Sequence, residues 1–369
     1  MRTFTAVRYL HRRTPQRQSS PSKTFLIRDG TNTMQIGTGL LTAQRRRDES
    51  RPTSEIYAEL LNLARATEEA GLDSIWVSEH HFSDDGYLPG TMPTLAAIAG
   101  VTDTIELGTY IAIAPLYGPV RLAEDAATVD LLSDGRFTLG LGLGYRESEF
   151  ENFGVPYQER ADRLEDTIHL VKGAWTPGPI DHDSSFHDAS PKAEVIPKPA
   201  QDPHPRIMLG AMAKPAVRRA ALYGQGWAAI GNMSFEALKT RKDHIDAVRK
   251  EHGLDDDYTI YVAKYGFIDE SAEVAWDKIK DGYLHMQRKY AEWATGEKVD
   301  SLADEQIADV KDDVLLGSPT EILAELKKYQ EALGDDIHVM FRTYYPGIGT
   351  DKMTDCIDTL GDEVVPELR

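Results

Sequence analysis

The chain has one cysteine, Cys356, among its 369 residues. An intrachain disulfide needs two cysteines and a thiolate metal cluster needs several, so the sequence excludes both. Proteins without disulfides suit a reducing compartment, and we therefore expect a cytoplasmic location.

Long apolar runs and positive charge are also scarce. Apolar stretches such as residues 111–116 are far shorter than the roughly 20 residues that a membrane-spanning helix needs. Lys and Arg number 41 against 60 Asp and Glu, which gives a formal net charge of -19. Because Lys and Arg dominate the binding of nucleic-acid phosphates, we expect a small-molecule ligand, and neither a nucleic acid nor a membrane as partner.

Residues 1–33 differ in composition from the rest of the chain. They are rich in Arg, and their only acidic residue is Asp29. This composition predicts a basic, disordered extension. It is also typical of a transit peptide, although the apolar core of a secretory signal is absent. The alternative that we favour is a start assigned too early, so that one domain, residues 34–369, opens at Met34.

From Met34 onward, apolar runs alternate with helical patterns, as in β-α units around a parallel sheet. The segment Ser318-Pro319-Thr320-Glu321 predicts a capping box at the start of the last of these helices, and Gly334 predicts its end. Eight strands with intervening helices favour a closed (β/α)8 TIM barrel with insertions. The candidate strands lie near 35–41, 74–79, 105–113, 137–143, 206–211, 226–231, 258–268 and 337–344.

Two connections are too long for simple turns between strands and helices. One, residues 173–205, is rich in proline and has no periodic pattern, and the other covers roughly 294–317. Long loops in compact domains are commonly lids or binding elements. We predict that the insertion at 173–205 is a lid over the barrel mouth.

The strongest chemical signal is a strand that ends in Glu79-His80-His81. The carboxyl ends of barrel strands are where α/β barrels carry out catalysis. Two interpretations are open: the three side chains hydrogen-bond neighbouring loops, or an imidazole acts as a general base, for which histidine is suited near neutral pH.

A metal site is a third interpretation of the same residues. His182 and His187 could complete such a site. Their loop is irregular and no helical pair of histidines is present, so we predict no bound metal.

Two further patterns each leave two interpretations open. The glycines of 140–144 lack the G-x-G-x-x-G spacing of a dinucleotide site. They either allow close strand packing or clear space for a flat ring. Arg160 and Arg163 either form solvated ion pairs or bind a phosphate, whose oxygens match the guanidinium fork.

Several motifs between Trp76 and Gly154 resemble the alpha chain of bacterial luciferase-like flavin monooxygenases in order and spacing. The likeness is weaker beyond Gly154, and it fades in 173–205 and after Asp269. It implies a barrel with an insertion, a pocket for reduced flavin at the carboxyl face, and a homodimer. The motifs are Trp76-x-x-Glu79-His80-His81-Phe82, Leu107-Gly108-Thr109, Pro119-Val120-Arg121-x-Ala123-Glu124-Asp125, Leu132-Ser133-x-Gly135-Arg136-Phe137 and Phe150-x-x-Phe153-Gly154.

The resemblance also implies roles for individual residues. His80 matches the family's catalytic base, and Tyr110-Ile111 matches a non-prolyl cis peptide that supports the flavin ring. The other cofactor-binding positions that it implies are Glu79, Gly142, Tyr145, Arg160, Ala211, Met212, Ala213 and Gly231.

This sequence departs from the family pattern around the phosphate. Gly142 replaces a cysteine, and Leu143 replaces a phosphate-binding arginine. Apolar residues also replace polar phosphate contacts after the fifth strand, at Met212, Ala213 and Ala216. What remains for a phosphate is the start of the helix after Ala213, with Lys214 nearby and Arg160 from the preceding unit.

The activity that the resemblance implies is a monooxygenase that uses reduced FMN and O2 to oxidise a small organic substrate. A separate flavin reductase would supply the reduced FMN, since no nicotinamide site is apparent in the chain. Two alternatives stay open: an F420-dependent oxidoreductase that transfers hydride, and a flavin-binding protein without catalysis.

If residues 1–33 lie outside the fold, their deletion leaves the thermal stability and the flavin affinity unchanged. Thermal melts and flavin titrations of a chain that starts at Met34 measure both. A large loss in either would show that the extension belongs to the folded structure.

Overall fold

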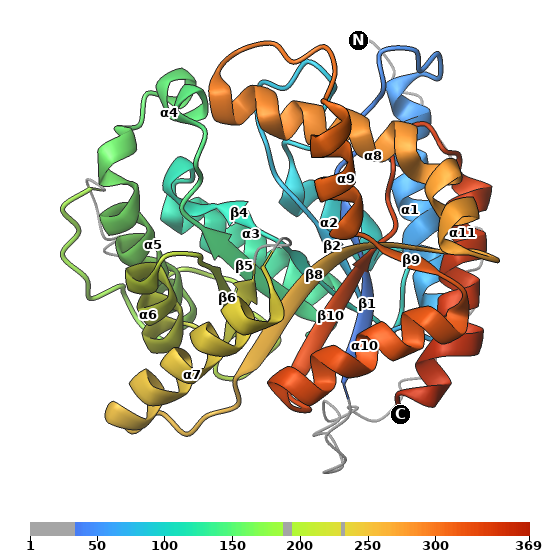
Figure 1. Ribbon diagram of the computed structural model, residues 1–369. Coiled ribbons are helices and arrows are strands. Elements are labelled where there is room, and N and C mark those ends of the chain that lie inside the picture. Colours follow the sequence, from blue (N-terminus) through green and yellow to red (C-terminus); the bar gives the residue numbers. More distant parts are fainter. Residues whose placement is uncertain (1–33, 187–193, 230–232) are drawn as a thin grey trace, which may run out of the picture. The chain divides into compact units, whose positions relative to one another are not determined.

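The computed structural model describes residues 34–186, 194–229 and 233–369, so the predicted extension, residues 1–33, lies outside the described residues. A closed barrel of eight parallel strands forms the centre (Figure 1), and β10 closes it by pairing with both β8 and β1. This confirms the predicted (β/α)8 fold. The barrel strands are β1 (Gln35–Leu41), β2 (Ser74–Val77), β3 (Glu106–Thr109), β5 (Phe137–Gly142), β6 (Arg206–Gly210), β7 (Gly226–Ala229), β8 (Thr259–Ile268) and β10 (Ile337–Arg342).

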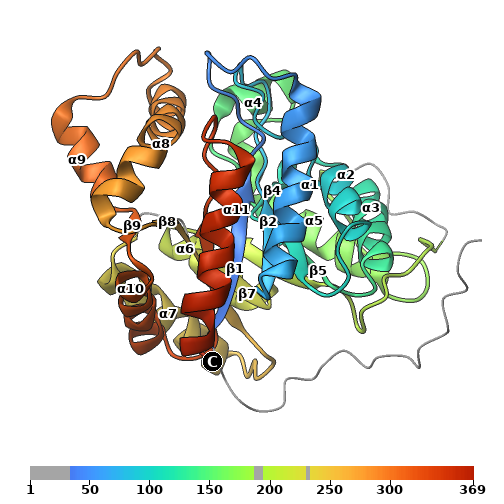
Figure 2. The ribbon, with the colours of Figure 1, turned by 90° about the vertical axis from the view of Figure 1, so that its right-hand side faces the viewer.

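Helices surround the barrel and run back against the strand direction (Figure 2). The predicted capping box at Ser318 and the helix end before Gly334 are both present. Among the described residues, every helix is too short or too polar to cross a membrane. The surrounding helices are α1 (Thr53–Glu69), α2 (Thr91–Ala99), α3 (Pro119–Leu132), α5 (Arg160–Trp175), α6 (Lys214–Tyr223), α7 (Phe235–Glu251), α10 (Pro319–Leu333) and α11 (Thr350–Thr359).

The remaining elements extend this plan. Three helices lie in connections that follow the carboxyl ends of β5 and β8, namely α4 (Glu147–Phe153), α8 (Ala272–Thr295) and α9 (Asp304–Asp312). The others are the short strands β4 (Ala112–Ile113) and β9 (Leu315–Gly317), which pair with β5 and β8, and the single turns η1 (Ala114–Leu116), η2 (Tyr157–Glu159), η3 (Leu360–Val364) and η4 (Val365–Glu367).

Large aromatic side chains fill the barrel, and glycines on neighbouring strands make room for them. Trp76 and Tyr261 are buried inside, with ring centroids 5.4 Å apart. A Cβ atom on Gly108 would lie 2.4 Å from Cζ3 of Trp76, and one on Gly226 would lie 2.6 Å from Cε2 of Tyr261. Such distances are far inside van der Waals contact, so the two aromatic rings require these glycines.

The glycines of β5 also serve packing. A Cβ on Gly140 would lie 1.9 Å from the carbonyl oxygen of Thr109, and one on Gly142 would lie 2.4 Å from Cδ1 of Ile111. Protein atoms therefore already fill the space beside both glycines. Of the two interpretations of this motif, the geometry favours close strand packing.

The described parts of residues 173–205 lie at the amino ends of the strands and not over the mouth, contrary to the predicted lid. In its described parts, the side chain of Lys198 donates to the carbonyl oxygen of Ala174 at the end of α5, with an Nζ to O distance of 2.8 Å. The side chain of Gln201 donates to the carbonyl oxygen of Phe137, the first residue of β5, at 2.7 Å. A connection that follows a helix returns to the amino ends of the strands, so it lies opposite the mouth.

Replacing Gly108 by Ala forces a methyl group against Trp76, and we expect the free energy of unfolding to fall by about 1–3 kcal/mol, as for other overpacked cores. Denaturant titration measures the change. Gly100→Ala is the matched control, because Gly100 has φ -74° and its added Cβ would lie no closer than 3.5 Å to another atom. An equal loss in both variants would contradict the packing account.

Candidate active site

His80 lies just beyond β2 and forms a buried pair with Glu149 of α4. Its Nδ1 is 2.9 Å from Oε1 of Glu149, and neither residue exposes more than 7% of its surface. The same oxygen accepts hydrogen bonds from the backbone N–H of His81 at 2.8 Å and from Nη1 of Arg146 at 2.9 Å. Three donors therefore converge on one carboxylate oxygen.

These donors decide the charge of Glu149. Burial raises its pKa, but the hydrogen bond and charge of His80, the backbone N–H of His81 and the charge of Arg146 lower it by more, so the net pKa lies below the ordinary value. An ionised carboxylate accepts a hydrogen bond from the N–H of His80 Nδ1. In the neutral imidazole this leaves the lone pair on Nε2.

The Nε2 side of His80 faces aromatic residues. The Tyr145 hydroxyl lies 3.3 Å from Nε2 and donates to it. The imidazole ring packs edge-on against Tyr87 at 4.8 Å between centroids, and against Trp293 of α8 at 4.5 Å. An acceptor nitrogen surrounded by aromatic rings is suited to taking up a proton in a site with little water.

His81 and Glu79 point elsewhere. Nε2 of His81 is 2.6 Å from Oε1 of Glu79, and the His81 ring packs against Phe153 at 4.8 Å. The other carboxylate oxygen of Glu79 accepts from the hydroxyl of Tyr117 at 2.7 Å and from the backbone N–H of Ile113 at 3.3 Å. Glu79 is thus fully bonded within the protein, and these contacts match the structural interpretation of these two residues.

The Tyr110-Ile111 peptide bond is cis, which confirms the expectation drawn from the resemblance. Tyr110 is buried, and its hydroxyl donates to the carbonyl oxygen of Ala229 in β7. The side chain of Ile111 lies over Gly142 and Gly210. These residues close the barrel interior on the side of β3 and β5.

The start of α6 presents backbone N–H groups. Ala213 is its N-cap, no side chain caps the first turn, and Lys214 is the first helical residue. Met212 is half exposed, whereas Ala211 is buried and its carbonyl oxygen accepts from the indole of Trp227 at 2.9 Å. Uncapped N–H groups at a helix start attract anions, so this turn is suited to a phosphate.

Two predicted cofactor positions remain: Arg160, which the structure describes, and Gly231, which it does not. Arg160 stacks on the ring of Tyr157 at 3.8 Å and donates to its carbonyl oxygen, and Arg163 forms an ion pair with Glu159 at 2.8 Å. Gly231 lies outside the described residues.

His182 and His187 of the insertion are the two histidines that could have completed a metal site, and we predicted that no metal binds. Nε2 of His182 is 2.6 Å from Oδ1 of Asp166 on α5, and its ring stacks on His169. His187 lies outside the described residues. In the part of the chain that the structure describes, no three His, Cys, Asp or Glu side chains are placed to share a metal ion.

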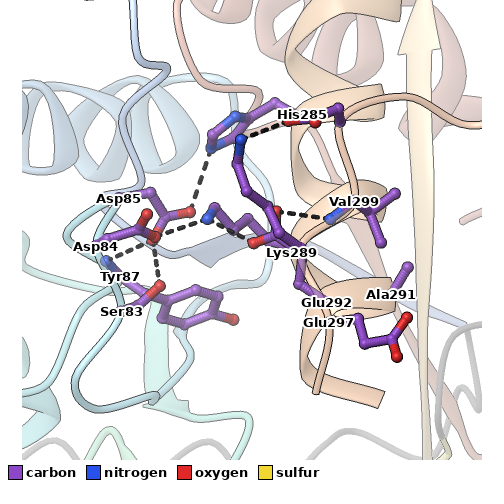
Figure 3. A network of polar contacts seen from close by, with 12 residues as sticks. Ser83, Asp84, Asp85, Tyr87, His285, Lys289, Ala291, Glu292, Glu297 and Val299 are labelled. Atoms are coloured by element: carbon purple, nitrogen blue, oxygen red, sulfur yellow. Dashed lines mark hydrogen bonds and ion pairs between the residues drawn. The ribbon is translucent and has the colours of Figure 1, made fainter. Parts of the chain in front are cut away.

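A polar network holds α8 beside this site (Figure 3). Asp85, in the loop after β2, accepts from Gln44 at 2.7 Å and from Ser83 at 2.5 Å, and its Oδ2 lies 3.2 Å from Nε2 of His285 on α8. Lys289, one turn further along α8, bonds Asp84 at 2.7 Å. Because Trp293 is on the same helix, these contacts hold its ring against His80.

A family comparison agrees with this geometry. The profile described as luciferase-like monooxygenase matches residues 34–336. The chain belongs to this family. The family includes flavin-dependent and F420-dependent enzymes, so membership shows an oxidoreductase without naming its cofactor.

Two curated relatives illustrate that range. The chain is 23% identical over 347 residues to the oxygenase component of a flavin-dependent trigonelline monooxygenase from Acinetobacter baylyi, covering 89% of this chain and 94% of the relative. It is 26% identical over 328 residues to an F420-dependent glucose-6-phosphate dehydrogenase from Amycolatopsis mediterranei, covering 84% and 94%. Among solved structures, the monooxygenase RslO1 from Streptomyces bottropensis shares the fold, with a TM-score of 0.82, 22% identity, and coverage of 91% and 100%.

Sequence reasoning missed several residues of this family member's site. Glu149 and Arg146 stand three residues apart next to the Phe150 motif, and a carboxylate beside buried aromatics was a usable signal. Trp293 lies in a helix that follows β8, and no local pattern connects it with His80.

We expect Asp85→Asn to weaken the attachment of α8 and to lower the melting temperature at pH 7. Burial raises the pKa of Asp85, but bonds from His285, Ser83 and Gln44 lower it by more, so the net pKa is lowered. Its stabilising effect is therefore present above the unfolded pKa of about 3.9 and is lost as the pH falls through the folded pKa.

Thermal melts of wild type and Asp85→Asn between about pH 7 and pH 2 measure this, and the difference in melting temperature should shrink below about pH 3.9. The matched control is Asp84→Asn, because the Asp84 side chain is 69% exposed and Lys289 keeps its bond to Glu292. A pH-independent difference for Asp85→Asn would contradict an ionised Asp85 carboxylate.

Proposed function

We propose that this protein is a flavin-dependent monooxygenase that uses reduced FMN and O2 to oxidise a small organic substrate. The observation that carries the proposal is the Glu149-His80 pair, which leaves Nε2 of His80 as an acceptor among aromatic rings. The similarity to an oxygenase component supports a two-component arrangement, with a separate flavin reductase as partner.

The residues around His80 have different roles in the proposed reaction. Nε2 of His80 accepts a proton during oxidation and returns it afterwards, while Glu149 fixes the tautomer and stabilises the imidazolium. Trp293 and Tyr87 limit the access of water to the ring of His80. When bound, reduced FMN would supply the electrons for the reaction with oxygen.

The residues present fit such a cofactor in two places. The β3 to β4 corner at Tyr110 and Ile111 offers an apolar support beside the mouth, and the uncapped first turn of α6 offers N–H groups to the phosphate. Two cations stand at this turn: Lys214 is its first helical residue, and Arg241 donates from Nε to the carbonyl oxygen of Met212 at 2.9 Å. Leu143 and Met212 add no polar contact, so the phosphate would depend mainly on backbone donors.

F420-dependent hydride transfer is the second candidate, because an F420-dependent dehydrogenase is among the relatives and the apolar phosphate region does not favour FMN. A flavin-binding protein without catalysis is a third. Titrations with FMN and F420, followed by oxygen uptake with the reduced cofactor, separate the three. Uptake only with reduced FMN supports the monooxygenase, hydride transfer with F420 alone supports the second, and binding without turnover supports the third.

The proposal also covers the domain organisation, the compartment and the oligomeric state. We place the activity in one domain, residues 34–369, with residues 1–33 outside it, and we propose a cytoplasmic homodimer. The single cysteine supports the proposed compartment, and the match of the family from residue 34 supports the proposed domain start.

His80→Ala should leave FMN affinity within a few fold but lower product formation by about 10²–10⁴, the usual contribution of general acid-base catalysis. Hydrogen peroxide release per FMN oxidised should rise, because oxygen is then consumed without substrate oxidation. Stopped-flow absorbance of bound reduced FMN and a peroxide assay measure these quantities.

His81→Ala is the matched control, because His81 bonds Glu79 and not Glu149 through its side chain. We expect it to affect thermal stability more than turnover. Small and equal effects in two well-folded variants would refute the role of His80 and favour the F420 alternative.

A further inference from the structure

Arg342 is a buried cation at the carboxyl end of β10. It follows His338 and Met340 at every second position, and both of these belong to the barrel interior, so its side chain also faces inward. Only 8% of its surface is exposed. Its guanidinium carbon lies 3.8 Å from the centre of the Tyr265 ring.

The guanidinium has a neutral phenol as partner, since a hydrogen bond with the Tyr290 side chain helps to raise its pKa, but two of its nitrogens lack any. Nε and Nη2 of Arg342 are both buried and have no hydrogen-bond partner among the described residues. Within the described residues, no carboxylate forms an ion pair with Arg342. Arg stays protonated in proteins, and a buried charge without a partner is strongly unfavourable.

Stacking on Tyr265 does not satisfy these nitrogens. The ring lies against the face of the guanidinium, whereas N–H bonds point outward in its plane. Nε and Nη2 form one edge of the group, and their parallel N–H bonds match the two oxygens of a carboxylate. The hydroxyl of Tyr265 is also buried without a partner among the described residues.

The neighbourhood of Arg342 is continuous with the His80 site. Burial lowers the pKa of Arg342, but the hydroxyls of Tyr265, Tyr290 and Tyr87 raise it by more, which places these three groups around the cation. Tyr87 packs on His80, and Tyr290 packs on Trp293 with centroids 5.3 Å apart. A chain of aromatic side chains therefore connects the cation with the imidazole.

We propose that Arg342 binds the carboxylate of the organic substrate, and that this substrate is a flat aromatic carboxylic acid held among these rings. The proposal rests on the proposed function, because it places the substrate beside His80. The cofactor phosphate is a poor alternative partner, since α6 follows β6, which is separated from β10 by β7 and β8 in the barrel. The edge of the flavin ring is the competing partner.

Calorimetric titration of the FMN-loaded full chain with benzoate, and with its neutral isostere benzamide, tests the proposal without turnover. We expect benzoate to bind at least tenfold more tightly than benzamide. In Arg342→Gln, benzoate affinity should fall at least tenfold, to the level of benzamide, with FMN affinity within twofold of wild type. Arg342→Lys keeps the charge without the fork and should lose part of the preference.

Arg288→Gln is the matched control, because Arg288 is a surface arginine on α8 and its loss should leave both affinities unchanged. The wild-type comparison holds even if Arg342→Gln does not fold. Equal binding of benzoate and benzamide, or no binding of either, would overturn the proposal. A parallel loss of FMN affinity in Arg342→Gln would assign the guanidinium to the flavin. None of these outcomes depends on whether His80→Ala loses turnover, so the two proposals fail separately.

Discussion

The hydrogen bond between Glu149 and Nδ1 of His80 is the interaction on which the candidate site depends. It joins residues 69 positions apart, and the carboxylate that makes it is held by two further donors from Arg146 and His81. Without an ionised acceptor on Nδ1, nothing fixes which imidazole nitrogen carries the proton. The same contact holds α4 against the loop after β2. A change that breaks it therefore alters both the orientation of the His80 ring and the packing of α4.

The barrel fixes the positions of the strand ends from which His80 and Glu149 extend. Trp76 and Tyr261 fill its interior, and glycines on the neighbouring strands leave room for their rings. At the carboxyl end the interior changes from packed rings to polar side chains. Among them are His80, whose Nε2 accepts from Tyr145, and Arg342, whose Nε and Nη2 have no partner among the described residues. α8 adds Trp293 from outside the barrel, and its attachment through Asp85 is polar (Figure 3). α8 also buries Ile279, Tyr283 and Met286 in the core, so apolar packing and the Asp85 network hold it together.

The sequence was sufficient for what depends on local patterns. Alternating apolar runs predicted the strands, and Ser318 to Glu321 predicted a cap, because each depends on residues close in the chain. The orientation of the 173–205 connection could also have been predicted, since a segment that follows α5 must return to the amino ends of the strands. Glu149, Trp293 and Arg342 could not be assigned to the site, because each meets it through contacts distant in sequence. The two interpretations of Gly142 likewise needed the position of the Ile111 side chain.

The central claim is that His80 presents an unprotonated Nε2 because Glu149 holds the proton on Nδ1. Nitrogen-15 NMR of the imidazole rings in the neutral state measures this directly, with Glu149→Gln used to assign the His80 signals. We expect a protonated Nδ1 and an unprotonated Nε2 of His80 in wild type, and a change of tautomer population in Glu149→Gln. A wild-type His80 with its proton on Nε2 would contradict the account.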